Sequence, residues 1–244
     1  ERRYLKPKRV TEFYAADKNE KKQTHIVIGW LLGSSTNLTE LFQAELLNII
    51  LLDNSSSPML EALETSELGS APSPICGLEN SNREMTFMLG FEGCDNNDLE
   101  SVESFILQSL AEIARLGIER KTIEAAIHQL ELSQREITGD SYPYGLQLIL
   151  SALSGAIHYG DPISLLNVDQ ALTHLQQDIQ DPLFITNLIN DLFINNPHRV
   201  TLSLQPDTEL ASQKEAEEKN ELATIKASLS QAEKEKIIEN AAKL

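Results

Sequence analysis

Cysteine, aromatic residues and long apolar runs are all scarce in this sequence of 244 residues. The two cysteines, Cys76 and Cys94, form no C-x-x-C pair, which argues against a disulfide framework and favours a reducing, intracellular compartment. The longest apolar runs, such as 46–52, are too short to span a bilayer. No signal peptide follows Glu1, and because the chain does not begin with Met we expect it to be a piece of a longer protein.

Positive charge is also in short supply. Lys and Arg number 20 against 37 Asp and Glu, which gives a net charge of −17 at pH 7. Binding to nucleic acid or to an anionic membrane requires clustered Lys and Arg, so the composition argues against both partners. A basic partner is compatible with this charge, and so is a role in solubility alone.

Motifs for nucleophilic catalysis and for phosphate binding are missing as well. The sequence has no G-x-S-x-G elbow, no P-loop and no G-x-G-x-x-G. None of the five histidines is paired at the i, i+4 spacing that places two imidazoles around zinc on one helix. Glu124, His128 and Glu131 share a predicted helix face and could meet one metal, but a solvated face explains them equally well. We therefore assign no catalytic, cofactor-binding or metal-binding residue.

The apolar periodicity that remains predicts a mixture of strands and helices. Expected strands cover residues 9–15, 25–32, 83–91 and 198–204, with a loop at 69–74. Expected helices begin near 38 and 58, and a long one begins at Asp95 or Asn97 and ends at Gly117. Further helices are expected over 120–138 and 146–153, with others that begin near 161, 169 and 181. Hairpins and helices in this order favour the α+β class, with a mostly antiparallel sheet and helices packed on one face.

Capping and breaking residues set the expected limits of these elements. Thr39 is the predicted cap of the first helix, and Gly117 and Gly139 are the predicted ends of the two long central helices. Pro206 is expected to stop the last strand.

The last 38 residues differ in composition from the rest. Residues 207–244 contain no Gly or Pro and are rich in Glu and Lys, with nine acids and six bases. The thin apolar stripe of Leu222, Ile225 and Leu229 predicts a long, mostly exposed helix. We expect residues 1–206 to form one α+β domain, with a net charge of −14, and residues 207–244 to form a charged helical linker.

Several segments, kept in order along the chain, carry a family resemblance. They are 24–33 (THIVIGWLLG), 70–74 (SAPSP), 77–81 (GLENS), 125–131 (AAIHQLE), 142–146 (YPYGL) and 196–201 (NPHRVT). Together they resemble the second domain of the presequence-protease branch of the pitrilysin and insulin-degrading-enzyme family of zinc peptidases. Since the similarity spans nearly the whole chain, it is more specific than any single motif.

The resemblance implies a parent protein of four related α+β domains in two halves, which close around a chamber and are joined by a helical hairpin. Residues 207–244 would enter that hairpin. In such enzymes the first domain binds zinc through H-x-x-E-H and a distal glutamate, whereas the second carries no zinc site. The matching positions here are 42–46 (FQAEL), where Glu45 remains but Phe42 and Leu46 replace the histidines. Zinc is therefore implied for the parent alone, bound by a missing upstream domain.

The implied function is that of a non-catalytic chamber-wall domain in a zinc metalloendopeptidase that degrades unstructured peptides such as presequences. The alternative is a stand-alone, inactive core or interaction subunit of the same fold. The implied partners are the other domains of the parent chain and peptide substrates, including basic ones. The first interpretation of the compartment is the bacterial cytoplasm, and the alternative is the mitochondrial matrix.

Overall fold

The computed structural model describes residues 3–16, 23–135 and 143–243. Contacts divide the chain into two compact units. The first contains residues 1–12 and 21–204, and the second contains residues 13–20 and 205–244. Each unit is described by itself below.

A six-stranded sheet organises the first unit. Its strands are β1 (Lys8–Ala15), β2 (Thr24–Ser34), β3 (Ala71–Pro72), β4 (Gly77–Glu79), β5 (Glu84–Cys94) and β6 (Arg199–Asp207). The strand order is β1-β6-β2-β5-β3, and β4 also pairs with β5. The pairs of β2 with β5 and β6, and of β5 with β3 and β4, are antiparallel. The predicted α+β class and antiparallel sheet are thereby confirmed.

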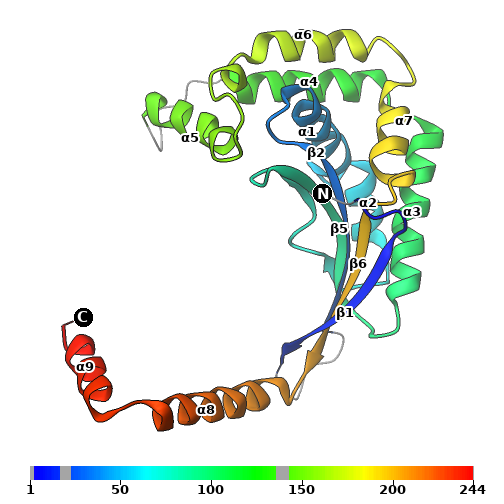
Figure 1. Cartoon of the computed structure of the whole chain (residues 1–244). Coiled ribbons are helices and arrows are strands. Elements are labelled where there is room, and N and C mark those ends of the chain that lie inside the picture. The colour runs from blue at the N-terminus through cyan, green and yellow to red at the C-terminus, as the bar shows by residue number, and fades with distance from the viewer. Residues whose placement is uncertain (1–2, 17–22, 136–142, 244) are drawn as a thin grey trace. The chain divides into compact units, whose positions relative to one another are not determined.

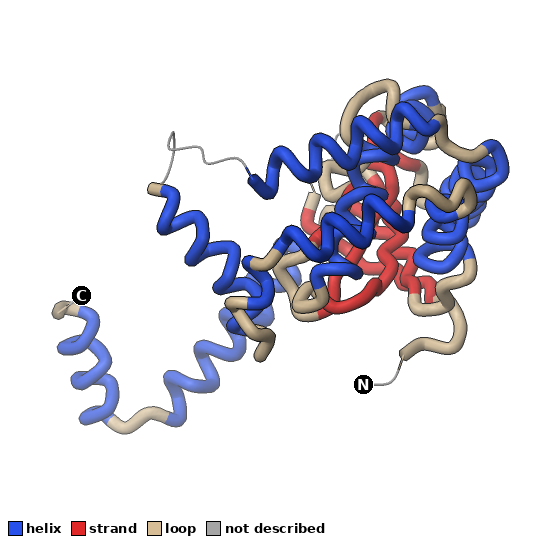
Figure 2. The backbone as a smooth tube through the Cα atoms, turned by 90° about the horizontal axis from the view of Figure 1, so that it is seen from above, coloured by secondary structure: helices blue, strands red, loops and turns tan. Residues whose placement is uncertain are grey.

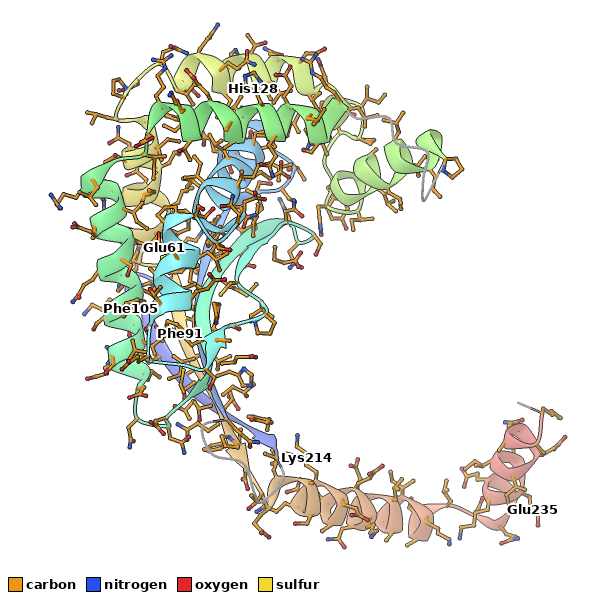
Figure 3. All side chains as sticks on the ribbon, turned by 180° about the vertical axis from the view of Figure 1, so that it is seen from behind. Glu61, Phe91, Phe105, His128, Lys214 and Glu235 are labelled. Atoms are coloured by element: carbon orange, nitrogen blue, oxygen red, sulfur yellow. The ribbon has the colours of Figure 1, made fainter. Side chains whose placement is uncertain are left out.

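Helices cover one face of this sheet. They are α1 (Leu38–Leu52), α2 (Pro58–Thr65), α3 (Leu99–Leu116), α4 (Arg120–Arg135), α5 (Tyr144–Ile157), α6 (Val168–Asp178) and α7 (Phe184–Ile189), with a 3₁₀ turn η1 (Ser164–Leu166) and a π-turn η2 (Asn190–Ile194). Figure 1 shows α2, α3 and α7 beside the sheet, and Figure 2 shows from above the helices, in blue, against the strands, in red. Figure 3 labels Phe91 on β5 and Phe105 on α3, whose rings lie 5.9 Å apart.

The core lies between that sheet face and the helices. Trp30 of β2 is fully buried, and its Nε1 donates to the Phe193 carbonyl oxygen at 3.0 Å. The Phe193 ring lies 5.4 Å from Trp30 and 4.9 Å from Phe87 of β5, as measured between ring centroids. A buried indole N–H that finds an acceptor removes the penalty of burying a polar group. Trp30 is therefore a core residue.

Two expected limits were wrong. Strand β6 runs through Pro206 to Asp207 instead of stopping at Pro206. The last residue of β6 that pairs with β2 is Leu204, so the missing N–H of Pro206 removes no bond from that ladder. The segment 69–74, expected to be a loop, contains the two-residue strand β3.

Several helices begin at residues other than those expected. Asn37, rather than Thr39, caps α1, because its side chain accepts from the Thr39 N–H. Helix α6 begins at Val168, so Asp169 lies in its first turn. Near Asp161 only the short turn η1 forms, since the Asp161 carboxylate accepts from the Ile163 N–H in a local turn. Gly117 ends α3 with a positive φ of 76°, as predicted, whereas Gly139 lies outside the described residues.

The second unit contains the predicted C-terminal helix, divided into two pieces. Helix α8 covers Leu210–Ser228 and α9 covers Gln231–Ala241, and neither buries any residue. The break follows from a new helix start at Ser230, whose side chain and that of Glu233 form a capping box.

Candidate functional site

Helix α1 holds the positions that would carry a zinc motif, and its start is fixed by the strand before it. The Glu40 carboxylate accepts from the Ser34 N–H at 2.7 Å and from the Asn37 amide at 2.8 Å. Gly33 permits this approach, because a Cβ at that position would lie 1.9 Å from Glu40 Oε2. The end of β2 therefore sets where the helix begins.

Phe42 and Leu46 are core residues. Their side chains are 1% and 0% exposed. Residues four apart share a helix face, and here that face packs into the core. The two side chains that replace imidazoles in the pattern thus contribute to apolar packing.

Glu45 lies next to this core face and is half-buried, with its Oε2 atom fully buried. Its Oε1 accepts from the Asn80 amide at 3.2 Å, while its buried Oε2 has no hydrogen-bond partner within the described part of the chain. Burial disfavours the charged form and raises the pKa of Glu45 to about 7, and the bond from Asn80 opposes this shift. The carboxyl group is therefore partly protonated near neutral pH.

The loop between β4 and β5 is attached to both α1 and the end of α5. On the α1 side, the loop residue Asn80 donates to Glu45, and in the adjoining β4 the Leu78 N–H donates to Asn48 Oδ1 at 3.0 Å. His158 Nε2 lies 2.8 Å from the Ser81 carbonyl oxygen. The site thus consists of hydrogen bonds that join α1, the loop after β4 and the end of α5. The Oε2 atom of Glu45 is the one carboxyl oxygen among these described groups without a hydrogen-bond partner. Sequence reasoning singled out Glu45 but gave no indication of its contact with Asn80 or of that between His158 and Ser81.

The candidate helix face of Glu124, His128 and Glu131 holds ion pairs instead of a metal-binding arrangement. Glu124 bonds to Arg120 at 2.8 Å, and Glu131 lies 3.2 Å from Arg135. His128, labelled on α4 in Figure 3, is exposed. Among residues 3–16, 23–135 and 143–243, no group of three or more His, Cys, Asp or Glu side chains is placed to hold a metal ion.

A cavity of about 440 Å³ lies between the start of α1 and α6. Its lining is mainly of small polar side chains, and His174 is the one ionisable residue that contributes to it. A single imidazole supplies too few ligands for a zinc site.

Comparison with known proteins identifies the family. The family described as the Peptidase M16 inactive domain matches residues 2–130. This chain belongs to that family. It is 33% identical over 224 residues to mitochondrial presequence protease of Xenopus laevis, which covers 91% of this chain and 22% of the relative. It is 32% identical over 234 residues to the chloroplastic/mitochondrial presequence protease 1 of Arabidopsis thaliana, covering 93% and 22%.

The resemblance found in the sequence is confirmed at the level of the family. A solved peptidase M16 inactive domain from Pseudomonas fluorescens has the same fold, with a TM-score of 0.55 at 14% identity over 83% of this chain and 44% of that one. The chain spans about a fifth of the length of the curated relatives that it matches. Across the described residues, no helix is both long enough and apolar enough to cross a membrane.

Proposed function

We propose that this chain is a non-catalytic wall domain of a larger zinc metalloendopeptidase that degrades unstructured peptides such as presequences. The observation that carries the proposal is the match to an inactive peptidase domain, in a chain whose positions 42 and 46 hold core side chains. Hydrolysis by this class needs a metal with about three protein ligands, an open position for water and a carboxylate base. In the proposal, another domain of the parent chain binds the zinc.

We also propose that residues 1–206 form the wall domain and residues 207–244 the linker that enters the hairpin between the halves. Residues 205–244 form a compact unit together with residues 13–20, apart from the rest of the chain. This supports the proposed division. The linker helices α8 and α9 bury no residue, as expected of a segment that has no core of its own.

The proposed substrates include basic peptides. Residues 1–206 carry a net charge of −14, and presequences are basic and poor in acids. The relatives are named as mitochondrial or chloroplastic presequence proteases, which supports this class of substrate. For the compartment we propose a reducing, intracellular one, either the bacterial cytoplasm or the mitochondrial matrix, where Cys76 and Cys94 remain reduced and form no disulfide.

Metal analysis and turnover test the proposal together. After mild chelation and refilling with zinc, we expect the 244-residue chain to hold less than stoichiometric zinc and to leave an unstructured peptide intact. The full-length parent should hold one zinc and cleave that peptide, and Glu45→Gln in the parent should leave turnover unchanged. One tightly held zinc in the isolated chain, with turnover abolished by Glu45→Gln, would overturn the proposal. A parent gene without an upstream H-x-x-E-H would instead favour the stand-alone subunit.

A further inference from the structure

Helix α5 carries an exposed apolar stripe. Its residues occur at i, i+3, i+4, i+7 and i+11, which places them on one helix face. They are Leu146, Ile149, Leu150, Leu153 and Ile157, which are 38%, 61%, 48%, 47% and 59% exposed. Five half-exposed Leu and Ile side chains in one row form a contiguous apolar patch, and such patches often mark interaction sites.

The opposite side of α5 is anchored to the first unit. Gly155 is buried, and a Cβ at this position would lie 1.7 Å from Leu165 Cδ1 in η1. His158, which follows the helix, contacts the Ser81 carbonyl oxygen at 2.8 Å. In Figures 1 and 2 the helix runs clear of α4. Close packing at Gly155 thus fixes the C-terminal part of this side of α5, while Leu148 near the start of the helix is 36% exposed, and the apolar stripe faces outward.

Charge distinguishes among the possible occupants of the stripe. Residues 141–160 contain no Asp, Glu, Lys or Arg, although such residues make up 23% of the chain. A surface that selects basic peptides would place carboxylates beside its apolar contacts, and an anionic membrane would require Lys or Arg. Leu and Ile at this spacing fit the apolar groove or helix face of a permanently associated protein surface.

The rest of the parent polypeptide is long enough to supply an apolar surface that covers the stripe. The curated relatives are aligned with this chain over 22% of their length, so more than three quarters of each relative lies outside the match. An apolar surface within the same polypeptide is present at a high effective concentration, so a moderate patch is sufficient for stable docking.

We infer that the stripe on α5 is a docking surface for another domain of the parent polypeptide, which covers it with an uncharged, apolar groove or helix face. The inference rests on the proposed function in one respect, namely that the chain is one domain of a longer protein. It adds the surface through which this domain is held and the chemistry of what faces it.

Thiol labelling measures whether the stripe is covered. Ile149→Cys places a reporter at the most exposed position of the stripe, and Leu132→Cys on α4, where the leucine is 64% exposed, provides the matched control. We expect both thiols to react rapidly in the 244-residue chain. In the full-length parent, the thiol at position 149 should react at least about tenfold more slowly than in the isolated chain, whereas the thiol at 132 should keep its rate. Equal rates at position 149 in the two proteins would overturn the inference.

The other occupants give different results. Protection at position 149 in the isolated chain that grows with protein concentration would assign the stripe to a second copy and overturn the inference. Protection in the parent only after an unstructured peptide is added would assign it to substrate, with the same consequence. Hydrogen exchange of the α5 backbone in wild-type protein gives the same comparison without a substitution, in case the Ile149→Cys variant does not fold.

The main comparison, between the isolated chain and the parent, is made without zinc or peptide, so it is independent of turnover. If position 149 were protected in a parent that binds no zinc, the docking surface would be supported and the proposed function would be contradicted. If the parent showed zinc-dependent turnover but no protection at position 149, the proposed function would be supported and the docking surface would be contradicted.

Discussion

Glu45→Gln should change how the stability of this chain depends on pH. The pKa of Glu45 is raised from its ordinary value of 4.5 to about 7 by burial. Between these values the folded carboxyl keeps its proton while the unfolded one releases it, so the unfolded state binds fewer protons. The wild-type protein therefore loses stability as the pH rises from 4.5 to 7, and the loss is complete above the folded pKa. At 1.36 kcal/mol per pH unit, the group contributes a decrease of about 3 kcal/mol over this window.

The variant removes this titration but keeps an acceptor for the Asn80 amide. Its new amide N–H groups have no acceptor at the buried Oε2 position, which costs about 1–2 kcal/mol at every pH. The quantity to follow is the difference in unfolding free energy between variant and wild type, measured as a function of pH. The constant cost shifts this difference equally at every pH, so it does not affect how the difference changes with pH. We expect this difference to move in favour of the variant by about 3 kcal/mol between acidic and mildly alkaline pH.

Urea denaturation at fixed ionic strength, from about pH 5 to about pH 9, provides the measurement. Glu61→Gln on α2 is the matched control, because Glu61 is an exposed carboxylate, labelled in Figure 3. Its curve should run parallel to that of the wild type. If the Glu45→Gln and wild-type curves were parallel as well, the carboxyl would be ionised in the folded state and the argument from burial would be refuted.

Three further outcomes are expected. Phe42→His combined with Leu46→His should destabilise the chain by more than about 4 kcal/mol and bind no zinc, because both side chains face a packed core; circular dichroism melting and metal analysis check this. Limited proteolysis should cleave within residues 207–244 first and leave a folded product that ends near Pro206, since α8 and α9 bury nothing; mass spectrometry identifies the product, and equal resistance of the tail would contradict this. Added salt should reduce kcat/KM of the full-length parent more for a basic peptide than for a neutral one, and equal reductions would leave the acidic charge with a role in solubility alone.

The long elements could be predicted from the sequence because each has a clear apolar period. The run of apolar residues in 26–32 became β2, and the stripe that begins at Leu99 became α3. The start of α3 was misplaced by two to four residues because Asp95 and Asp98 form a hydrogen-bonded turn before the helix. Several short polar residues in a row each qualify as a cap, and the sequence does not show which one the fold uses.

Elements held by distant partners were less predictable. Strand β3 has two residues and contains Pro72, so its local sequence is that of a loop, and it is a strand because β5 pairs with it. The break between α8 and α9 was different, since Ser230 and Glu233 have the S-x-x-E spacing of a capping box. This spacing is visible in the sequence and would have predicted a helix start at Ser230. The continuous Glu- and Lys-rich composition favoured a single helix instead.

The environment of Glu45 could not be read from α1 alone. Periodicity places residue 45 beside the core face, but its burial depends on the loop after β4, where Asn80 reaches the carboxylate. Strand β4, which leads into that loop, is attached to α1 through the bond from the Leu78 N–H to Asn48. Gly77 makes the approach possible with a φ of 123°, since a Cβ there would lie 3.1 Å from Asn48 Oδ1. The raised pKa of Glu45 is thus a tertiary property that arises only when α1 meets β4 and the loop that follows it.

Burial of this carboxyl without a full set of partners is a cost to the isolated domain. In a zinc site a glutamate at this place in H-x-x-E-H would have a metal-bound water to act on, whereas here its neighbours at 42 and 46 fill the core. If the pH prediction holds, a neutral side chain at position 45 would make the domain more stable at alkaline pH than the natural one. Stability of the isolated domain would then be a poor explanation for a glutamate at this position. A role for Glu45 would have to be sought at the junction of α1 with the loop after β4, a loop that His158 also contacts from the end of α5.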